Sequence, residues 1–192
     1  MKELESYISQ FFGLKGDDLL SIAPFFKQTA FKKGEYYLKP GEICGSLSFQ
    51  TSGYVRFYLD DGEKEITQWI SSKGGFIADL RGIIFKQPSK SYVQALTDCT
   101  LYTINNDDYA KIGILIPAWH QLEKLFIANC FVFMEDRIFS LLSMNSEERY
   151  NWLFNHNPEL FNHVPLQYLA SMMSMTPETL SRIRKKQTEI AN

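Results

Sequence analysis

The sequence of 192 residues contains no long apolar run, no cysteine pair at metal-binding spacing and no large excess of charge of either sign. Its longest nearly apolar stretch, residues 125–134, includes Asn129 and is far shorter than the roughly 20 residues that a membrane-spanning helix needs. The N-terminal Met-Lys-Glu-Leu-Glu lacks the apolar core of a signal peptide. These absences predict a soluble, cytoplasmic protein without a membrane partner.

Metal sites and enzyme active sites are not indicated either. The cysteines are far apart and show no Cys-x-x-Cys spacing, at positions Cys44, Cys99 and Cys130. The three histidines share no metal-ligand spacing, and no Ser/His/Asp or Cys/His arrangement stands out. We therefore expect buried free thiols, no metal, no cofactor and no enzymatic activity.

The placement of charge is more informative than its total. A formal net charge of −2 gives the whole protein no attraction to nucleic acid. Basic side chains nonetheless gather near the end of the sequence, at Arg182, Arg184, Lys185 and Lys186. A local cluster of this kind is suited to neutralising the phosphates of a nucleic acid.

The segment that carries this cluster, residues 164–186, has the pattern of two short helices joined by a tight turn. Ala170 is a small residue where two helices could cross, and Ser174-Met175 follows as the turn. Thr176 is suited to cap the second helix, and Pro177 is tolerated at its first position, where a backbone N–H is not needed. The second helix would then expose Pro177, Glu178, Ser181, Arg182 and Lys185. This pattern alone is compatible with two interpretations, a helix that binds DNA and a basic helix that is only solvated.

The middle of the chain has a different pattern. From residue 25 to 104, turn signals recur about every ten residues between segments rich in Tyr, Phe and Ile, which predicts an antiparallel sandwich or roll. Residues 54–59 and 65–70 flank an Asp-Gly turn and form the clearest hairpin. The first 24 residues favour short helices that cover the roll.

A single long helix is predicted from residue 118 to 142. Its apolar stripe is wider than one surface contact requires, so the helix is expected to cover the roll and also to pair with the same helix of a second subunit. Asn145 and Glu148 then form a capping-box pattern that opens the next helix. The predicted organisation is a roll with N-terminal helices (1–116), a dimerisation helix (117–143) and a C-terminal helical domain (144–192).

This order of elements resembles the Crp/Fnr family of bacterial transcription regulators over residues 31–186. The most specific similarity is in residues 168–170 (Tyr-Leu-Ala) and 175–182 (Met-Thr-Pro-Glu-Thr-Leu-Ser-Arg), with looser similarity in the roll. The resemblance implies an α+β fold with an N-terminal jelly-roll (double-stranded β-helix) domain like those that bind cyclic nucleotides, a long dimerisation helix and a C-terminal winged helix-turn-helix. Its implied partners are double-stranded DNA, a second copy of the chain through helix 118–142, and RNA polymerase.

By position in the matched motif, the resemblance also implies which residues contact DNA. Glu178 would accept from a cytosine amine, Arg182 would bind guanine, and Ser181 would contact a base edge or a phosphate. Pro177 stands where the family has a further arginine. The full implied set is Thr176, Pro177, Glu178, Ser181, Arg182, Arg184, Lys185 and Lys186. Residues 187–192 are too few for the β-hairpin that usually follows, so a truncated wing is expected.

The resemblance places a ligand pocket at Phe76, Ala78, Asp79, Leu80, Arg81, Ser89, Lys90 and Ser91. Members that bind cyclic nucleotides have a Gly-Glu pair where this chain has Ala78-Asp79, and an arginine where it has Ser89. A serine cannot replace the charged, bidentate contact of a guanidinium to a phosphate, so the usual binding of cyclic AMP is not expected and the effector is unknown. The alternative is a ligand sensor that acts through protein partners and whose helix-turn-helix no longer functions.

Overall fold

The computed structural model describes residues 2–191, and the side chains of residues 2–187. The chain divides into two compact units. The first comprises residues up to Phe57 together with Ser71–Phe131, and the second comprises Tyr58–Ile70 together with the residues from Val132 onward. The boundaries therefore cut through a β-hairpin and through the long helix.

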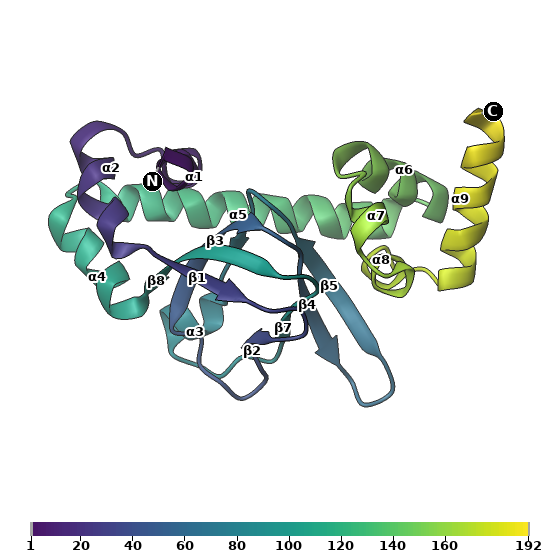
Figure 1. The fold of residues 1–192 in the computed structure, drawn as a ribbon, viewed down its shortest axis with the longest axis horizontal. Coiled ribbons are helices and arrows are strands. Elements are labelled where there is room, and N and C mark those ends of the chain that lie inside the picture. Colours follow the sequence, from purple (N-terminus) through teal and green to yellow (C-terminus); the bar gives the residue numbers. More distant parts are fainter. Residues whose placement is uncertain (1, 192) are drawn as a thin grey trace. The chain divides into compact units, whose positions relative to one another are not determined.

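Short helices form the beginning of the first unit, as predicted from the apolar spacing of this segment. They are α1 (Lys2–Phe12), α2 (Gly16–Ile22) and the 3-10 turn η1 (Ala23–Phe25) (Figure 1). One face of α1 is buried, including Leu4, Ile8 and Phe12. These helices therefore close one side of the core instead of standing free in solvent.

Two four-stranded sheets make up the roll, which confirms the predicted antiparallel sandwich. Their orders are β1-β8-β3-β6 and β2-β7-β4-β5. The strands are β1 (Lys27–Phe31), β2 (Tyr36–Leu38), β3 (Ser46–Ser52), β4 (Val55–Asp60), β5 (Glu65–Ser71), β6 (Phe76–Ile77), β7 (Tyr92–Ala95) and β8 (Cys99–Asn105), with helix α3 (Leu80–Phe85) between β6 and β7. The hairpin predicted around the Asp-Gly turn is β4–β5. Gly53 joins β3 to β4 at a φ of +85°, where a side chain would collide with the backbone of Asp98.

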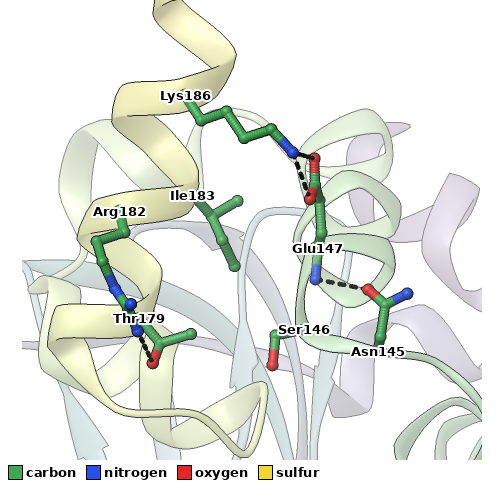
Figure 2. Close-up of a pocket in the computed structure, with 7 residues that line it drawn as sticks. All are labelled: Asn145, Ser146, Glu147, Thr179, Arg182, Ile183 and Lys186. Carbon is green, nitrogen blue, oxygen red and sulfur yellow. Dashed lines mark hydrogen bonds and ion pairs between the residues drawn. The ribbon is translucent and has the colours of Figure 1, made fainter.

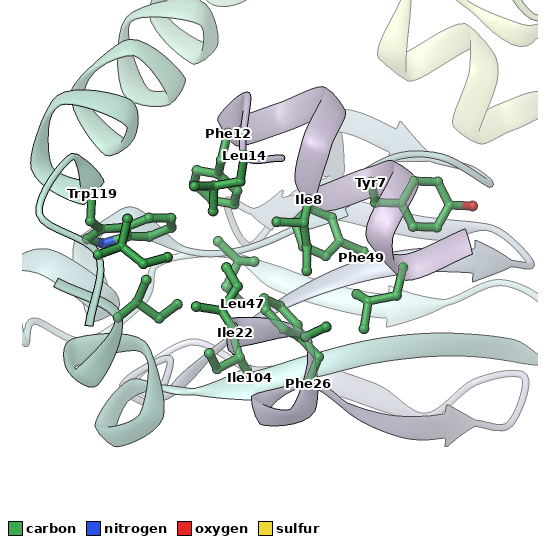
Figure 3. Close-up of a cluster of buried hydrophobic side chains, with 14 of the residues drawn as sticks. Tyr7, Ile8, Phe12, Leu14, Ile22, Phe26, Leu47, Phe49, Ile104 and Trp119 are labelled. Atoms are coloured by element: carbon green, nitrogen blue, oxygen red, sulfur yellow. The ribbon is translucent and has the colours of Figure 1, made fainter. Parts of the chain in front are cut away.

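An aromatic cluster fills the core of the first unit (Figure 3). Phe49 of β3 is fully buried at its centre, where its ring lies 5.4 Å from that of Phe11 and 5.5 Å from that of Phe26, measured between centroids. Trp119 and Phe126 join the cluster from the first half of the long helix. The roll, the N-terminal helices and the start of the long helix thus share one core.

Helices make up the rest of the chain. They are α4 (Asn106–Leu115), α5 (Trp119–Ser143), α6 (Ser146–His156), α7 (Leu160–His163), α8 (Leu166–Met172) and α9 (Pro177–Ala191). The predicted long helix is confirmed as α5, and the predicted capping box is present at the start of α6. None of the described helices is long and apolar enough to cross a bilayer.

One boundary differs from the prediction. The second helix of the C-terminal pair was expected to end near Lys186, with residues 187–192 left over, but α9 continues to Ala191. Residues 187–191 (Gln-Thr-Glu-Ile-Ala) contain neither glycine nor proline, so nothing in their sequence stops the helix. Asn192 lies outside the described residues.

The aromatic core gives a direct test of the fold. Replacing Phe49 by Ala should lower the free energy of unfolding by about 3–5 kcal/mol, because the change leaves a cavity among closely packed rings. The matched control is Phe85→Ala, at a side chain that is 68% exposed, and this change should stay within about 0.5 kcal/mol. Urea unfolding followed by tryptophan fluorescence measures both variants. Equal losses would contradict the placement of Phe49.

Candidate nucleic-acid interface and ligand site

Helices α8 and α9 pack closely through small and apolar side chains. On α8, Leu169 and Ala170 are fully buried, and Leu180 is fully buried on α9. The N–H of Met175 donates to the carbonyl of Ala170 at 3.0 Å, so the chain turns back at the residue that was predicted to lie at the helix crossing. A small, fully buried residue therefore lies where the chain turns.

The turn between these helices contains Ser174 in a left-handed conformation, at a φ of +53°. A residue other than glycine rarely adopts this conformation, because its Cβ crowds the backbone. Thr176 follows as the cap of α9, and its Oγ1 accepts the N–H of Thr179 at 3.3 Å. Pro177 is the first residue of α9. The turn, the cap and the proline therefore occupy the places that the sequence pattern predicted.

Two arginines from other helices hold the end of α8. Arg137 of α5 donates to the carbonyl of Met172 at 2.8 Å, and Arg149 of α6 donates through Nε to the carbonyl of Met173, also at 2.8 Å. Arg149 donates in addition to the carbonyl of Met144. The last carbonyls of a helix have no partner within the helix, so these guanidinium groups satisfy atoms that the helix leaves open.

The other side of α8 contacts the β4–β5 hairpin. The hydroxyl of Ser171 accepts the N–H of Thr67 at 2.9 Å and lies 3.3 Å from the carbonyl of Glu65, to which it donates. Arg137 lies over the ring of Trp69, at 5.5 Å from the centroid, and burial lowers the pKa of its guanidinium from the usual value. Sequence analysis did not identify Arg137, Arg149 or Ser171. The contacts of Arg137 with Met172, of Arg149 with Met173 and of Ser171 with Thr67 span 35, 24 and 104 residues of sequence, so no local pattern predicts them.

All eight residues predicted to contact DNA are exposed on α9 or at its cap. Glu178 and Arg182 lie one turn apart on the helix, with Lys185 next along the same side. Hydrogen bonds from its own N–H and from Thr176, together with the charge of Arg182, lower the pKa of the Glu178 carboxyl. This carboxylate is therefore ionised at neutral pH and can accept a hydrogen bond.

The other two cations of the cluster face elements of the C-terminal region. Arg184 lies over the ring of Phe161 in α7, at 5.9 Å from its centroid. Lys186 binds Glu147 of α6, with its Nζ at 3.0 Å from Oε2 and 3.1 Å from Oε1. The cluster that looks uniform in the sequence is thus distributed over several sides of α9.

A shallow cavity of about 330 Å³ lies between the start of α6 and α9 (Figure 2). Its walls come from Asn145, Ser146, Glu147, Thr179, Arg182, Ile183 and Lys186. Arg182 and Lys186 line it from α9, and the Glu147 carboxylate lines it from α6 (Figure 2). The cavity combines cationic groups with one acid, beside the face that was predicted to bind DNA.

The predicted ligand stretch has a different environment. Asp79 caps α3, and its Oδ1 accepts the N–H of Arg81 at 2.9 Å. Ser89 is buried, and its Oγ accepts the N–H of Ser91 at 3.1 Å and donates to the same residue's carbonyl at 3.2 Å. Its backbone is paired with Gly41 and Glu42. Asp79 and Ser89, which stand where the resemblance implies ligand contacts, thus form hydrogen bonds with nearby backbone atoms.

The remaining members of that stretch lie in different places. The ring of Phe76 packs against Phe11 and Phe126, at centroid distances of 5.5 and 5.0 Å, and Ala78 packs against the same aromatic core. Leu80 is partly exposed, and Arg81 and Lys90 are exposed. The guanidinium of Arg81 lies 3.4 Å from Oε1 of Gln87. Part of the predicted pocket therefore belongs to the core, and its cations face solvent.

The long helix α5 exposes large apolar side chains along much of its length. Leu125, Val132 and Phe139 recur at seven-residue intervals and are each more than half exposed. The other large exposed side chains on this helix are Phe131, Phe133, Ile138 and Leu142, the last of which is 82% exposed. A seven-residue repeat of exposed apolar side chains is typical of a helix that pairs with another helix.

The cysteines are free, as expected. Cys44 and Cys99 are buried, whereas Cys130 is only partly buried, and burial raises the pKa of the Cys99 and Cys130 thiols. Such thiols are less reactive than an exposed cysteine. Within the part of the chain that the structure describes, no group of three or more His, Cys, Asp or Glu side chains could hold a metal ion.

The sequence was compared with protein families and with curated protein sequences. A scan against protein families matches residues 28–113 to the cyclic nucleotide-binding domain, which is a ligand-binding family and not an enzyme family. A search of curated protein sequences gives no significant match.

Several solved structures are similar to most of the chain. FixK2 from Bradyrhizobium japonicum has a TM-score of 0.74 at 15% identity, covering 86% of each chain. CLP, a c-di-GMP-responsive global regulator from Xanthomonas campestris, has a TM-score of 0.66 at 16% identity, covering 91% of this chain and 92% of that one. A CooA mutant from Carboxydothermus hydrogenoformans has a TM-score of 0.66 at 17% identity, covering 88% and 79%. Residues 28–113 thus match the cyclic nucleotide-binding domain family, and the chain shares the fold of these solved structures.

Proposed function

We propose that this protein is a dimeric, sequence-specific DNA-binding transcription regulator in which α9 enters the major groove. The observation that carries the proposal is the exposed face of α9, where Glu178, Ser181, Arg182 and Lys185 stand on a helix whose start is fixed by a cap and a tight turn. A helix held in this way presents its first two turns at a defined angle, which recognition of base edges requires. The proposal includes a cytoplasmic location, where DNA would be accessible, and RNA polymerase as a further partner.

The chemistry of this face supports roles for individual side chains. Arg182 can donate two hydrogen bonds to the O6 and N7 atoms of a guanine, and the ionised Glu178 can accept from the amine of a cytosine. Ser181, between them on the exposed side, can contact a base edge or a phosphate. Lys185 is one turn further along and is suited to a phosphate.

Dimerisation rests on α5. The exposed repeat of Leu125, Val132 and Phe139 would be covered by the same helix of a second copy, which removes large apolar side chains from water. Two-fold symmetry would then present two copies of α9 to half-sites about 34 Å apart along the DNA, which is one turn of the double helix.

The proposal also includes control by an effector, and cyclic AMP is not expected to bind in the way that is usual for the family. The Ser89 hydroxyl is engaged with Ser91, and Asp79 is engaged as the cap of α3, so neither offers the contacts that a cyclic phosphate and a ribose need. CLP, which has a similar fold, is described as responding to c-di-GMP. The fold is therefore compatible with more than one kind of signal.

A second function has one observation in its favour. Lys186 is bound to Glu147, and Arg184 lies over Phe161, so only part of the basic cluster faces away from the protein. A protein whose C-terminal helices no longer bind DNA, and which senses a ligand and acts through protein partners, would tolerate such an arrangement.

Binding to a pool of random duplexes separates these functions. The purified protein, at two salt concentrations, is expected to select a subset of sequences related by two-fold symmetry, because a dimer contacts two equivalent half-sites. Binding should weaken as salt rises, since cations on α9 displace counterions from the phosphates. Electrophoretic mobility followed by sequencing of the bound fraction measures both. Recovery of unselected sequence would favour the protein-partner function.

The base-reading role of Arg182 has its own test on the selected sequence. Arg182→Ala should cost about 1–3 kcal/mol of binding free energy and relax the preference at one base pair of each half-site. Lys185→Ala is the control, because it also removes one positive charge. It should keep the base preference and reduce by about one unit the slope of log affinity against log salt concentration. Titrations of both variants against matched and substituted duplexes supply the data. An unchanged base preference in Arg182→Ala would contradict its role.

The proposed loss of cyclic AMP binding is measured by thermal shift. Cyclic AMP at micromolar concentration should leave the unfolding temperature unchanged, because a ligand stabilises a protein only when its concentration is comparable with or above its dissociation constant. A Ser89→Arg variant is the matched comparison, and restores the charge at this position. A clear rise in the unfolding temperature of the wild-type protein would contradict the interpretation of Ser89.

A further inference from the structure

The contact between Lys186 and Glu147 joins the basic cluster of α9 to the first turn of α6. Lys186 Nζ donates to both carboxylate oxygens, at 3.0 and 3.1 Å, and the side-chain amide of Gln187 donates to Oε1 at 3.2 Å (Figure 2 shows the lysine contact). The two partners are 39 residues apart in the sequence. Glu147 thus accepts three hydrogen bonds from two neighbouring side chains of α9.

The chemistry of this site is that of an oxyanion held by cationic and amide donors. Glu147 and Lys186 line the same cavity as Arg182 and Thr179 (Figure 2). A DNA phosphate is also an oxyanion, and it is held by the same kinds of donors. The Glu147 carboxylate therefore accepts hydrogen bonds from Lys186 of the kind that a phosphate of bound DNA would accept.

We propose that Glu147 competes internally with DNA phosphates for Lys186 and thereby limits the affinity of the protein for DNA of any sequence. The inference rests on the proposed function, because it assigns a regulating side chain to the same interface. Glu147 has two effects in this account. It neutralises one cation of the cluster, and it places a negative charge in the cavity beside α9, where it repels an approaching phosphate.

The exposure of the pair makes the exchange feasible. The side chain of Lys186 is 59% exposed and that of Glu147 is 39% exposed. An ion pair in contact with water contributes little to stability. Lys186 can therefore exchange the Glu147 carboxylate for a phosphate of DNA at little cost in free energy. Phosphate contacts carry no sequence information, and the competition should therefore lower specific and non-specific affinity alike.

A purely structural role for Glu147 is the competing explanation. An acidic residue in the first turn of a helix is favourable because of the helix dipole, and Asn145 Oδ1 already accepts the N–H of Glu147 at 2.9 Å as part of the cap. If this were its only role, Glu147→Gln would lower the stability of α6 and leave DNA affinity unchanged or weaker. The two explanations thus predict opposite effects on binding.

The test compares Glu147→Gln with Glu159→Gln in the full-length protein. Both changes remove one negative charge from the C-terminal helices, but Glu159 pairs with His163 and not with α9. Dissociation constants are measured by fluorescence anisotropy on a labelled duplex of random sequence, between about 50 and 200 mM salt, the range over which phosphate contacts change affinity most visibly. A Lys186→Met variant, alone and combined with Glu147→Gln, shows whether the effect passes through the lysine.

Glu147→Gln is expected to bind DNA at least about threefold more tightly than Glu159→Gln at the lower salt, with a salt slope steeper by about one unit, because one further phosphate contact is gained. In the Lys186→Met background this difference should shrink. Equal affinities and slopes for the two glutamine variants, or weaker binding by Glu147→Gln, would overturn the inference while leaving the proposed function standing. Absence of binding by wild type and Glu147→Gln together would overturn both.

Discussion

The arrangement of α8 and α9 depends on hydrogen bonds from two guanidinium groups to the last carbonyls of α8. Arg137 and Arg149 come from α5 and α6, and both reach the backbone just before the turn. A helix ends with carbonyls that need partners, and here the partners also fix the direction in which the chain continues. The exposed face of α9 is consequently presented by contacts that lie outside α9 itself.

These contacts also explain how the turn tolerates Ser174. A left-handed residue other than glycine is strained, and such strain persists only where the surrounding structure determines the conformation. The hydrogen bonds at Met172 and Met173 on one side, and the Thr176 cap on the other, supply that determination. A less constrained turn would leave the angle of α9 variable, whereas its proposed role in binding DNA requires a fixed angle.

Local sequence patterns predicted much of the fold and part of the candidate site. Alternating apolar residues around an Asp-Gly turn were enough for the β4–β5 hairpin, and Asn145 with Glu148 was enough for the start of α6, because both depend on neighbours in the sequence. The contact of Lys186 with Glu147 could not be predicted, since it joins residues far apart in the chain. The end of α9 was placed too early because a stop was assumed where the sequence contains no helix-breaking residue.

In the domain that matches the cyclic nucleotide-binding family, the two side chains at the expected ligand positions bind the backbone of their own loops. Ser89 contacts Ser91, two residues further along its own loop, and Asp79 caps α3. The face of α9 that is proposed to bind DNA carries the charged residues Glu178, Arg182 and Lys185. Hydroxyl-radical footprinting of the protein on a selected duplex shows whether two copies of α9 bind successive turns of DNA. We expect two protected segments on one face of the DNA, with centres about 10 base pairs apart. A single protected segment, or no protection, would contradict this expectation.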